Sequence, residues 1–90
     1  MNNHITLKIR LFGAFRKFQS EPIVLTVASG ISVNGIKSAL AAELISLHST
    51  FKDTELIDKS AIANNSSVLE PNSYLTDDAE LAILPPVCGG

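Results

Sequence analysis

Residues 5–12 of the chain, ITLKIRLF, alternate between apolar and polar side chains. Ile5, Leu7, Ile9 and Leu11 fall on one side, and the charged residues fall on the other. A period of two is typical of a β-strand that buries one face. The stretch therefore predicts a first strand whose apolar side needs a covering layer.

A second strand is predicted at residues 22–27, PIVLTV. This stretch is rich in β-branched residues, and its proline stands first, where a missing N–H disturbs a strand least. We expect it to pair with the first strand in a hairpin. The segment between them, AFRKFQSE, is too mixed to predict a structure.

The period changes after Ser32, where apolar residues recur three or four positions apart. This spacing predicts one helix from Val33 to about His48, with Ser32 as its N-cap. The apolar stripe consists of Val33, Ile36, Leu40, Leu44 and Leu47.

The remaining elements are short. Residues 49–59 carry no sustained period and predict a connecting loop with room for one helical turn. Two short strands are expected at 60–63 and 66–70, separated by a turn at Asn64-Asn65, because asparagine tolerates positive φ. A last strand is expected at 80–84.

This order of elements predicts an α+β fold in which one main helix covers one face of a mixed sheet. The pattern is that of a ubiquitin-like β-grasp. We expect a domain over residues 1–84 and an extended tail over 85–90. The face beneath the helix is expected to consist of Ile5, Leu7, Ile9, Leu11, Leu81 and Ile83.

Size, charge and cysteine content exclude several classes of protein. Ninety residues with 46% hydrophobic content suit a single core. Seven Lys and Arg against nine Asp and Glu give a formal charge of -2, which disfavours nucleic acid as a partner. The single cysteine permits no intrachain disulfide. No export signal or membrane-spanning run is visible, so we expect a soluble, cytoplasmic protein.

The usual catalytic constellations are missing from the sequence. His4 and His48 are the only histidines, and neither stands at a metal-ligand spacing from the other or from Cys88. The glycines form no phosphate-binding motif. We therefore expect no bound metal or cofactor and no self-contained enzyme.

The end of the chain carries the functional hypothesis. Pro85-Pro86 follows the last strand and favours a stiff, extended backbone that cannot continue the sheet. Gly89-Gly90 lacks side chains and ends in a carboxylate, so it forms a tip slender enough for a narrow slot in another protein. Such a tip suits a substrate or a carrier.

Two segments, IRLFGAFRKF and LAILPPVCGG, together with the helix pattern after Ser32, resemble the small, sulfur-carrying subunit of molybdopterin synthase. That subunit belongs to the MoaD/ThiS β-grasp sulfur-carrier family, which also includes the thiamine-pathway carrier. The specific part of the resemblance is the PPVxGG pattern of the tail. Ala63-Asn64-Asn65 resembles the family's Ala-Val-Asn, from which Asn64 departs.

The resemblance implies a mechanism carried by Gly90. An E1-like adenylating enzyme would use ATP to adenylate its carboxylate, and a sulfur donor protein would replace AMP to leave a thiocarboxylate. The large subunit of molybdopterin synthase would hold the catalytic residues and use the sulfur to build molybdopterin, in a heterotetramer with two large subunits. The tail entering its active site would consist of Pro85, Pro86, Val87, Cys88 and Gly89.

Three alternatives remain open. The chain could carry sulfur for thiamine or another product, it could be a ubiquitin-like modifier joined to lysines, or it could be an interaction module with an accidental Gly-Gly end. Cys88 could attack the activated Gly90 carbonyl or form a mixed disulfide. We favour a small tail residue without special role, because no neighbouring charge in the sequence favours a reactive thiolate.

A partner interface is predicted near the tail. Phe12 and Leu84 are apolar residues in the polar phase of their strands, and Val68 could join them in an exposed apolar patch. A bulge or twist that turns one of them inward is the alternative. The resemblance implies that these positions face the large subunit.

Overall fold

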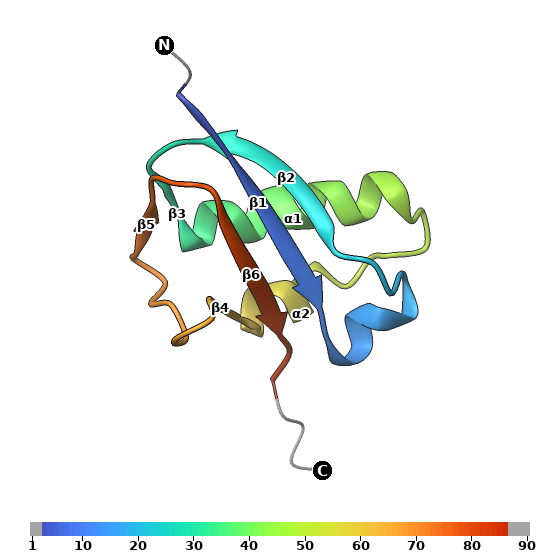
Figure 1. The fold of residues 1–90 in the computed structure, drawn as a ribbon. Helices are drawn as coiled ribbons and strands as arrows, with labels where there is room; N and C mark the ends of the chain where they lie inside the picture. Colours follow the sequence, from blue (N-terminus) through green and yellow to red (C-terminus); the bar gives the residue numbers. More distant parts are fainter. Residues whose placement is uncertain (1–2, 87–90) are drawn as a thin grey trace.

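The structure is a computed structural model and describes residues 3–86. Four strands form the main sheet in the order β2-β1-β6-β4 (Figure 1). β1 and β6 run parallel at its centre, and the other two pairings are antiparallel, which confirms the predicted mixed sheet. The strands are β1 (His4–Leu11), β2 (Ile23–Ala28), β4 (Ala61–Ala63) and β6 (Ala79–Leu84).

β1 and β2 form the predicted hairpin. Ile5 lies opposite Val27 and Ile9 lies opposite Ile23, so apolar residues of the two strands share one face. Buried and exposed residues alternate along both strands, as the period of two predicted.

Helix α1 (Val33–Leu47) covers that face and confirms the predicted helix (Figure 1). The Ser32 hydroxyl accepts a hydrogen bond from the Gly35 N–H at 3.0 Å, so Ser32 is the N-cap. Ile36, Leu40 and Leu44 are fully buried against the sheet. All six residues expected beneath the helix are buried: Ile5, Leu7, Ile9, Leu11, Leu81 and Ile83.

Two further helical segments bring aromatic and aliphatic side chains into the core. The 3₁₀ helix η1 (Gly13–Lys17) buries Phe15 in the segment that was too mixed to predict. Helix α2 (Thr54–Lys59) lies where a loop with one helical turn was expected, and it buries Ile57. Asp53 caps α2 by accepting from the Leu56 N–H at 3.1 Å.

The predicted strand at 66–70 is wrong. Val68 forms only an isolated bridge to Ala63, and the Leu69 N–H donates to the Ile62 carbonyl at 2.7 Å. A separate two-stranded sheet, which the sequence did not predict, pairs β3 (Ile31–Ser32) with β5 (Tyr74–Leu75).

The turn after β4 exists, but its predicted conformation is wrong. Among residues 3–86 positive φ occurs only at glycine. Instead, the side-chain oxygen of Asn64 accepts from the backbone N–H groups of Ser66 and Ser67, each at 2.8 Å. The side chain closes the turn by substituting for a backbone acceptor.

No helix within residues 3–86 combines the length and the hydropathy needed to cross a membrane.

Candidate functional site

The root of the tail lies at the end of the central strand β6. β6 ends at Leu84, beside the place where β1 ends and η1 begins (Figure 1). Gly13, the first residue of η1, has φ +58°, and a Cβ on Gly13 would lie 2.6 Å from Pro85 Cγ. Only glycine fits this close approach without displacing the proline ring. Gly13 was not among the predicted site residues, although a glycine directly after an alternating strand indicates a special turn.

The two prolines of the predicted tail differ in environment. Pro85 is partly buried, whereas Pro86 is exposed beside α2. Pro86 and α2 border a shallow depression of about 290 Å³. Val87, Cys88, Gly89 and Gly90 lie outside the described residues, so their roles stay predictions.

The three residues of the predicted interface lie on the face of the sheet opposite α1. Leu84 pairs with Ala61 in the sheet. Ile83, its neighbour in β6, is buried beneath α1, and neighbouring residues of a strand point to opposite faces. Leu84 therefore points to the open face. Val68 forms a bridge to Ala63, and Ala63 pairs with Ala82. Ala82 lies two residues before Leu84 in β6, so these side chains point to the same open face. Phe12 is 37% exposed and Val68 59%, so neither is turned into the core, and Leu84 is partly buried. Their role in binding stays a prediction.

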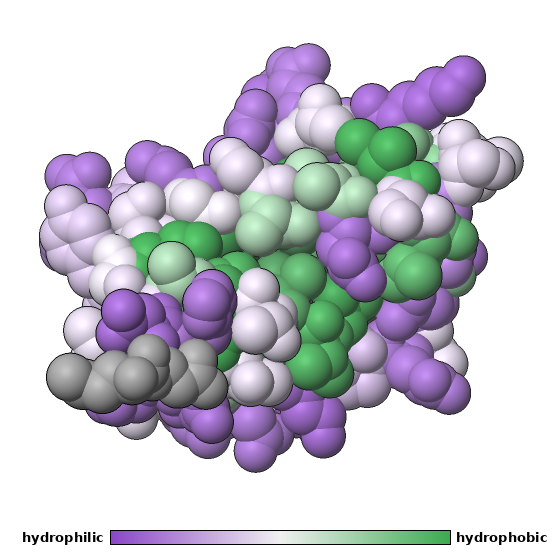
Figure 2. Space-filling view, turned by 90° about the horizontal axis from the view of Figure 1, so that it is seen from above, coloured by the Kyte–Doolittle hydropathy of each residue, from purple (hydrophilic) through white to green (hydrophobic). Residues whose placement is uncertain are grey.

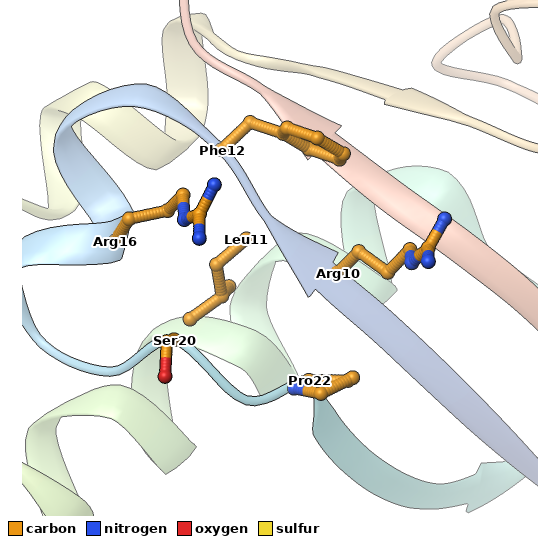
Figure 3. A pocket seen from close by; sticks show the side chains of 6 residues that line it. All are labelled: Arg10, Leu11, Phe12, Arg16, Ser20 and Pro22. Carbon is orange, nitrogen blue, oxygen red and sulfur yellow. The ribbon is translucent and has the colours of Figure 1, made fainter.

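Phe12 stands between two depressions of the surface. One has a volume of about 300 Å³ and is lined by Arg10, Leu11, Phe12, Arg16, Ser20 and Pro22 (Figure 3). The other, of about 70 Å³, lies toward β4 and β6 and is lined by Arg10 and Phe12 together with Asn64 and Glu80, among others. In Figure 3 the Phe12 ring and the Arg10 side chain both extend from β1 toward β6, while Arg16 points from η1 toward Phe12.

The arginines near Phe12 are exposed, and neither takes part in an ion pair within the part of the chain that the structure describes. The recorded ion pair joins Lys59 and Glu55 on α2, at 3.0 Å. The candidate site therefore combines an apolar ring with two exposed guanidinium groups.

Neither histidine lines the two depressions beside Phe12. His48, the C-cap of α1, lies 2.8 Å from the Gln19 side-chain oxygen through Nε2, and its ring packs against Phe18. His4 begins β1. Within residues 3–86, no three side chains of the types His, Cys, Asp and Glu lie close enough together to hold a metal ion.

A second apolar surface lies on another side of the molecule. Figure 2 looks down on the side of the molecule that is uppermost in Figure 1, where the β2 edge of the sheet and α1 lie, and shows apolar side chains gathered across the middle of this view. The exposed large apolar residues of α1 are Ile45 and Leu47. Val24 on β2 is also exposed, but it is paired with Lys8 and points to the open face of the sheet. This surface is separate from the root of the tail.

A mixed sheet that carries one main helix, with the last strand at its centre, defines a ubiquitin-like β-grasp protein. Residues 9–90 match the model of the ThiS family, so the chain belongs to the ThiS family. No curated protein sequence matches the chain.

Solved structures show the same fold. SAMP1 from Haloferax volcanii is 24% identical, with a TM-score of 0.67 over 94% of this chain and 99% of that chain. The ubiquitin of Caldiarchaeum subterraneum is 16% identical, with a TM-score of 0.63 over 97% and 99%. A Pyrococcus furiosus protein provisionally described as molybdopterin converting factor, subunit 1, is 21% identical, with a TM-score of 0.63 over 92% and 99%.

The ubiquitin-like β-grasp fold is thereby confirmed. The family match places the chain among ThiS-type sulfur carriers, and the solved structures show its ubiquitin-like fold.

Proposed function

We propose that this chain is a sulfur carrier and the small subunit of a molybdopterin synthase, acting in the cytoplasm. The observation that carries the proposal is the connection of β6 to the tail. β6 lies between β1 and β4, and the chain passes from it directly into Pro85-Pro86, with Pro85 seated against Gly13. A rigid sheet thus holds the root of the segment that leads to Gly90. The match to the ThiS family includes this segment.

The chemistry explains why the chain needs partners. A carboxylate is a poor electrophile, so an E1-like adenylating enzyme converts the Gly90 carboxylate and ATP into an acyl adenylate and pyrophosphate. Sulfide sulfur from a donor protein then attacks the acyl carbon and AMP leaves. The product is a thiocarboxylate, whose sulfur is a good nucleophile.

The large synthase subunit then receives the tail and supplies the catalytic residues. The thiocarboxylate sulfur bonds to a carbon of the precursor of molybdopterin. Water then cleaves the bond between this sulfur and the Gly90 acyl carbon, so the sulfur stays on the precursor and the chain is released with its carboxylate for another cycle. The Pyrococcus furiosus neighbour supports this pathway by its description, and we propose a heterotetramer with two large subunits.

The test is the sulfur transfer reaction with the adenylating enzyme, the sulfur donor and the large subunit. Deleting Gly90, or adding one residue after it, should abolish transfer while the thermal unfolding curve stays unchanged. Cys88→Ala is the control in the same tail and should retain full transfer. Unimpaired transfer by the Gly90 deletion would contradict the proposal.

A second candidate is a ubiquitin-like modifier, which SAMP1 and the Caldiarchaeum ubiquitin favour as neighbours in fold. Here the activated Gly90 would form an isopeptide with a lysine of another protein. The intact mass of the chain from its own cells separates the two. A sulfur carrier gains the mass difference between sulfur and oxygen, whereas a modifier gives larger conjugates.

A carrier for thiamine or another sulfur-containing product would share the thiocarboxylate and differ in the protein that accepts the sulfur. Sulfur transfer with the large synthase subunit decides between them.

A further inference from the structure

Strand β2 forms one edge of the main sheet. It pairs with β1 on one side, and the order β2-β1-β6-β4 has no strand on its other side among residues 3–86. The Ser29 N–H donates to the Asn3 carbonyl at 2.7 Å, just past the end of the ladder with β1. Pairs in an antiparallel ladder are hydrogen-bonded alternately, so the backbone groups that face β1 are those of Val27, Leu25 and Ile23.

The intervening residues direct their backbone N–H and C=O groups to the free edge: Val24, Thr26 and Ala28. The bond made by Thr6, which lies opposite Thr26 on β1, agrees with this phase. The Thr6 N–H donates to Asp78 Oδ1 at 2.7 Å and not to β2. The free edge of β2 therefore presents three residues whose backbone groups can hydrogen-bond to a further strand.

This edge carries none of the features that usually keep strands of different molecules apart. Residues 23–28, IVLTVA, contain no charged side chain and no proline, and their ladder with β1 runs without a bulge. An antiparallel strand of the same sequence, centred on Thr26, would place Thr26 opposite Thr26 and Val24 opposite Ala28. Such a pairing opposes no like charges, so β2 is complementary to itself.

Helix α1 has room for a second helix on the side away from α2. It makes its main contacts with the sheet at the edge strand β2. Lys37 Nζ donates to the Asp58 carbonyl of α2 at 3.1 Å, so this flank of α1 faces α2. Glu43 lies on the other flank and is partly buried. The small residues of that flank are Gly35, Ala39, Ala42 and Ser46. Small side chains allow a close approach between helix axes.

The apolar stripe of α1 continues past the sheet. Leu40 and Leu44 are fully buried, whereas Leu47 continues their three-to-four spacing and is 53% exposed. In Figure 1 the C-terminal end of α1 extends beyond β2, and Figure 2 shows apolar side chains on this side of the molecule. A strand added to β2 would lie over this end of the helix and cover Leu47.

We propose that two copies of this chain associate through their β2 strands and join their four-stranded sheets into one. A two-fold axis perpendicular to the sheet passes beside Thr26 and keeps both α1 helices on the same face. Thr26 then exchanges backbone hydrogen bonds with Thr26 of the second copy, and Val24 does so with Ala28. The edge thereby gains partners for all its free backbone groups.

The occupant is a second copy because both layers of the surface fit it. A separate peptide strand would satisfy the backbone of β2 but would leave the small flank of α1 uncovered. A second copy supplies the strand together with its own α1. The tails leave from β6, away from this edge, so the inference goes beyond the proposed function and does not depend on it.

The experiment is sedimentation equilibrium of the full chain at rising concentration, in salt that screens the Glu43 carboxylates of the two copies. The wild-type chain should dimerise reversibly. Thr26→Lys and Thr26→Glu should each raise the dimer dissociation constant at least about tenfold, because like charges then meet at the axis. An equimolar mixture of the two variants should recover the dimer, since opposite charges meet. The Thr26 side chain is exposed, so unfolding at low concentration should be unchanged.

Thr6→Lys is the matched control. Thr6 is exposed on the same face, opposite Thr26 but one strand in from the edge, and it receives the same charge. This variant should dimerise as the wild type does. Hydrogen exchange gives a second measurement. The amides of Val24, Thr26 and Ala28 should gain protection as the concentration rises, whereas those of Leu25 and Val27 should be protected throughout.

Several outcomes would overturn the inference. One is a wild-type chain that stays monomeric up to the millimolar range, including the case in which a strand of another protein protects the edge. Another is a dimer that both Thr26 variants retain, or that Thr6→Lys weakens equally. A mixture of Thr26→Lys and Thr26→Glu that stays monomeric would contradict the two-fold pairing. None of these measurements involves sulfur transfer, so the proposed function stands or fails separately.

Discussion

Gly13 and Pro85 meet at the point where the first strand ends and the tail begins. A β-carbon on Gly13 would stand 2.6 Å from Pro85 Cγ, and the glycine takes φ +58°. Contacts this short do not occur between real side chains, so the absence of a side chain at Gly13 lets the proline sit there. The direction in which the chain leaves β6 thus depends on a residue near the start of the sequence.

Gly13→Ala should lower the free energy of unfolding by about 1–3 kcal/mol, because it combines left-handed backbone strain with displacement of the proline ring. Chemical denaturation measures this. Gly30→Ala is the matched control, since Gly30 has φ +89° and nothing within 4 Å of an added Cβ. It should carry the backbone strain alone. Equal losses in the two variants would mean that the Pro85 contact contributes nothing measurable.

Phe12→Ala should weaken binding of the large synthase subunit by about 1–3 kcal/mol without unfolding the chain, because a ring that is 37% exposed on the predicted interface supplies apolar contact area. Isothermal titration measures the affinity. Tyr74→Ala removes an aromatic ring that is 70% exposed on β5, away from the open face of the main sheet. It should bind as the wild type does. Loss of affinity in both variants would argue against a localised interface.

Leu40→Ala should cost about 2–5 kcal/mol of stability, because the Leu40 side chain is fully buried between α1 and the sheet and its removal leaves a cavity. Leu47→Ala, at the exposed end of the same helix, should change stability by less than about 0.5 kcal/mol. Thermal or denaturant unfolding of the pair tests the orientation of the helix. Similar losses would contradict the packing described for α1.

Ser32→Ala should lower stability by about 1 kcal/mol, because the first turn of α1 loses the hydroxyl that accepts from the Gly35 N–H. Ser38→Ala changes an exposed serine inside the same helix, where alanine is the better helix former. It should be neutral or slightly stabilising. A denaturant midpoint for Ser32→Ala that matches the Ser38→Ala midpoint would disprove the cap.

Asn64→Ala should cost about 1 kcal/mol, since two backbone N–H groups lose their side-chain acceptor in the turn after β4. Asn65→Ala serves as the neighbour control, and its effect should stay within about 0.5 kcal/mol. Hydrogen exchange at the Ser66 and Ser67 amides is the direct measurement. Unchanged protection in Asn64→Ala would show that the turn closes without this side chain.

The parts of the fold that the sequence predicted are those with a long, regular period. The alternation around Ile9 indicates which face of β1 is buried, and the three-to-four spacing around Leu40 indicates which face of α1 is buried. In the structure these two faces pack against each other in the core. The phase of Phe12 and Leu84 likewise placed them on the open face of the sheet. A local pattern was sufficient because burial repeats along these elements.

The missed parts depend on distant contacts. β3 and β5 are two residues long and exist because Ile31 pairs with Leu75 across the chain, so neither carries a period of its own. Val68 looked like a strand residue, yet its segment forms one bridge instead of a ladder. Arg16 lies beside Phe12 because η1 is a 3₁₀ helix, which no simple sequence pattern predicts.

The position of β6 has a mechanical consequence. β6 is hydrogen-bonded to β1 over a parallel register from Ala79 to Ile83, and to β4 on its other side. A force along Pro85 and Pro86 acts parallel to β6 and therefore shears both of its hydrogen-bond ladders. All hydrogen bonds of a ladder carry such a force together. At an edge strand pulled sideways, they would break one after another. An enzyme could therefore draw the end of the chain taut within its active site while the domain behind it keeps its shape.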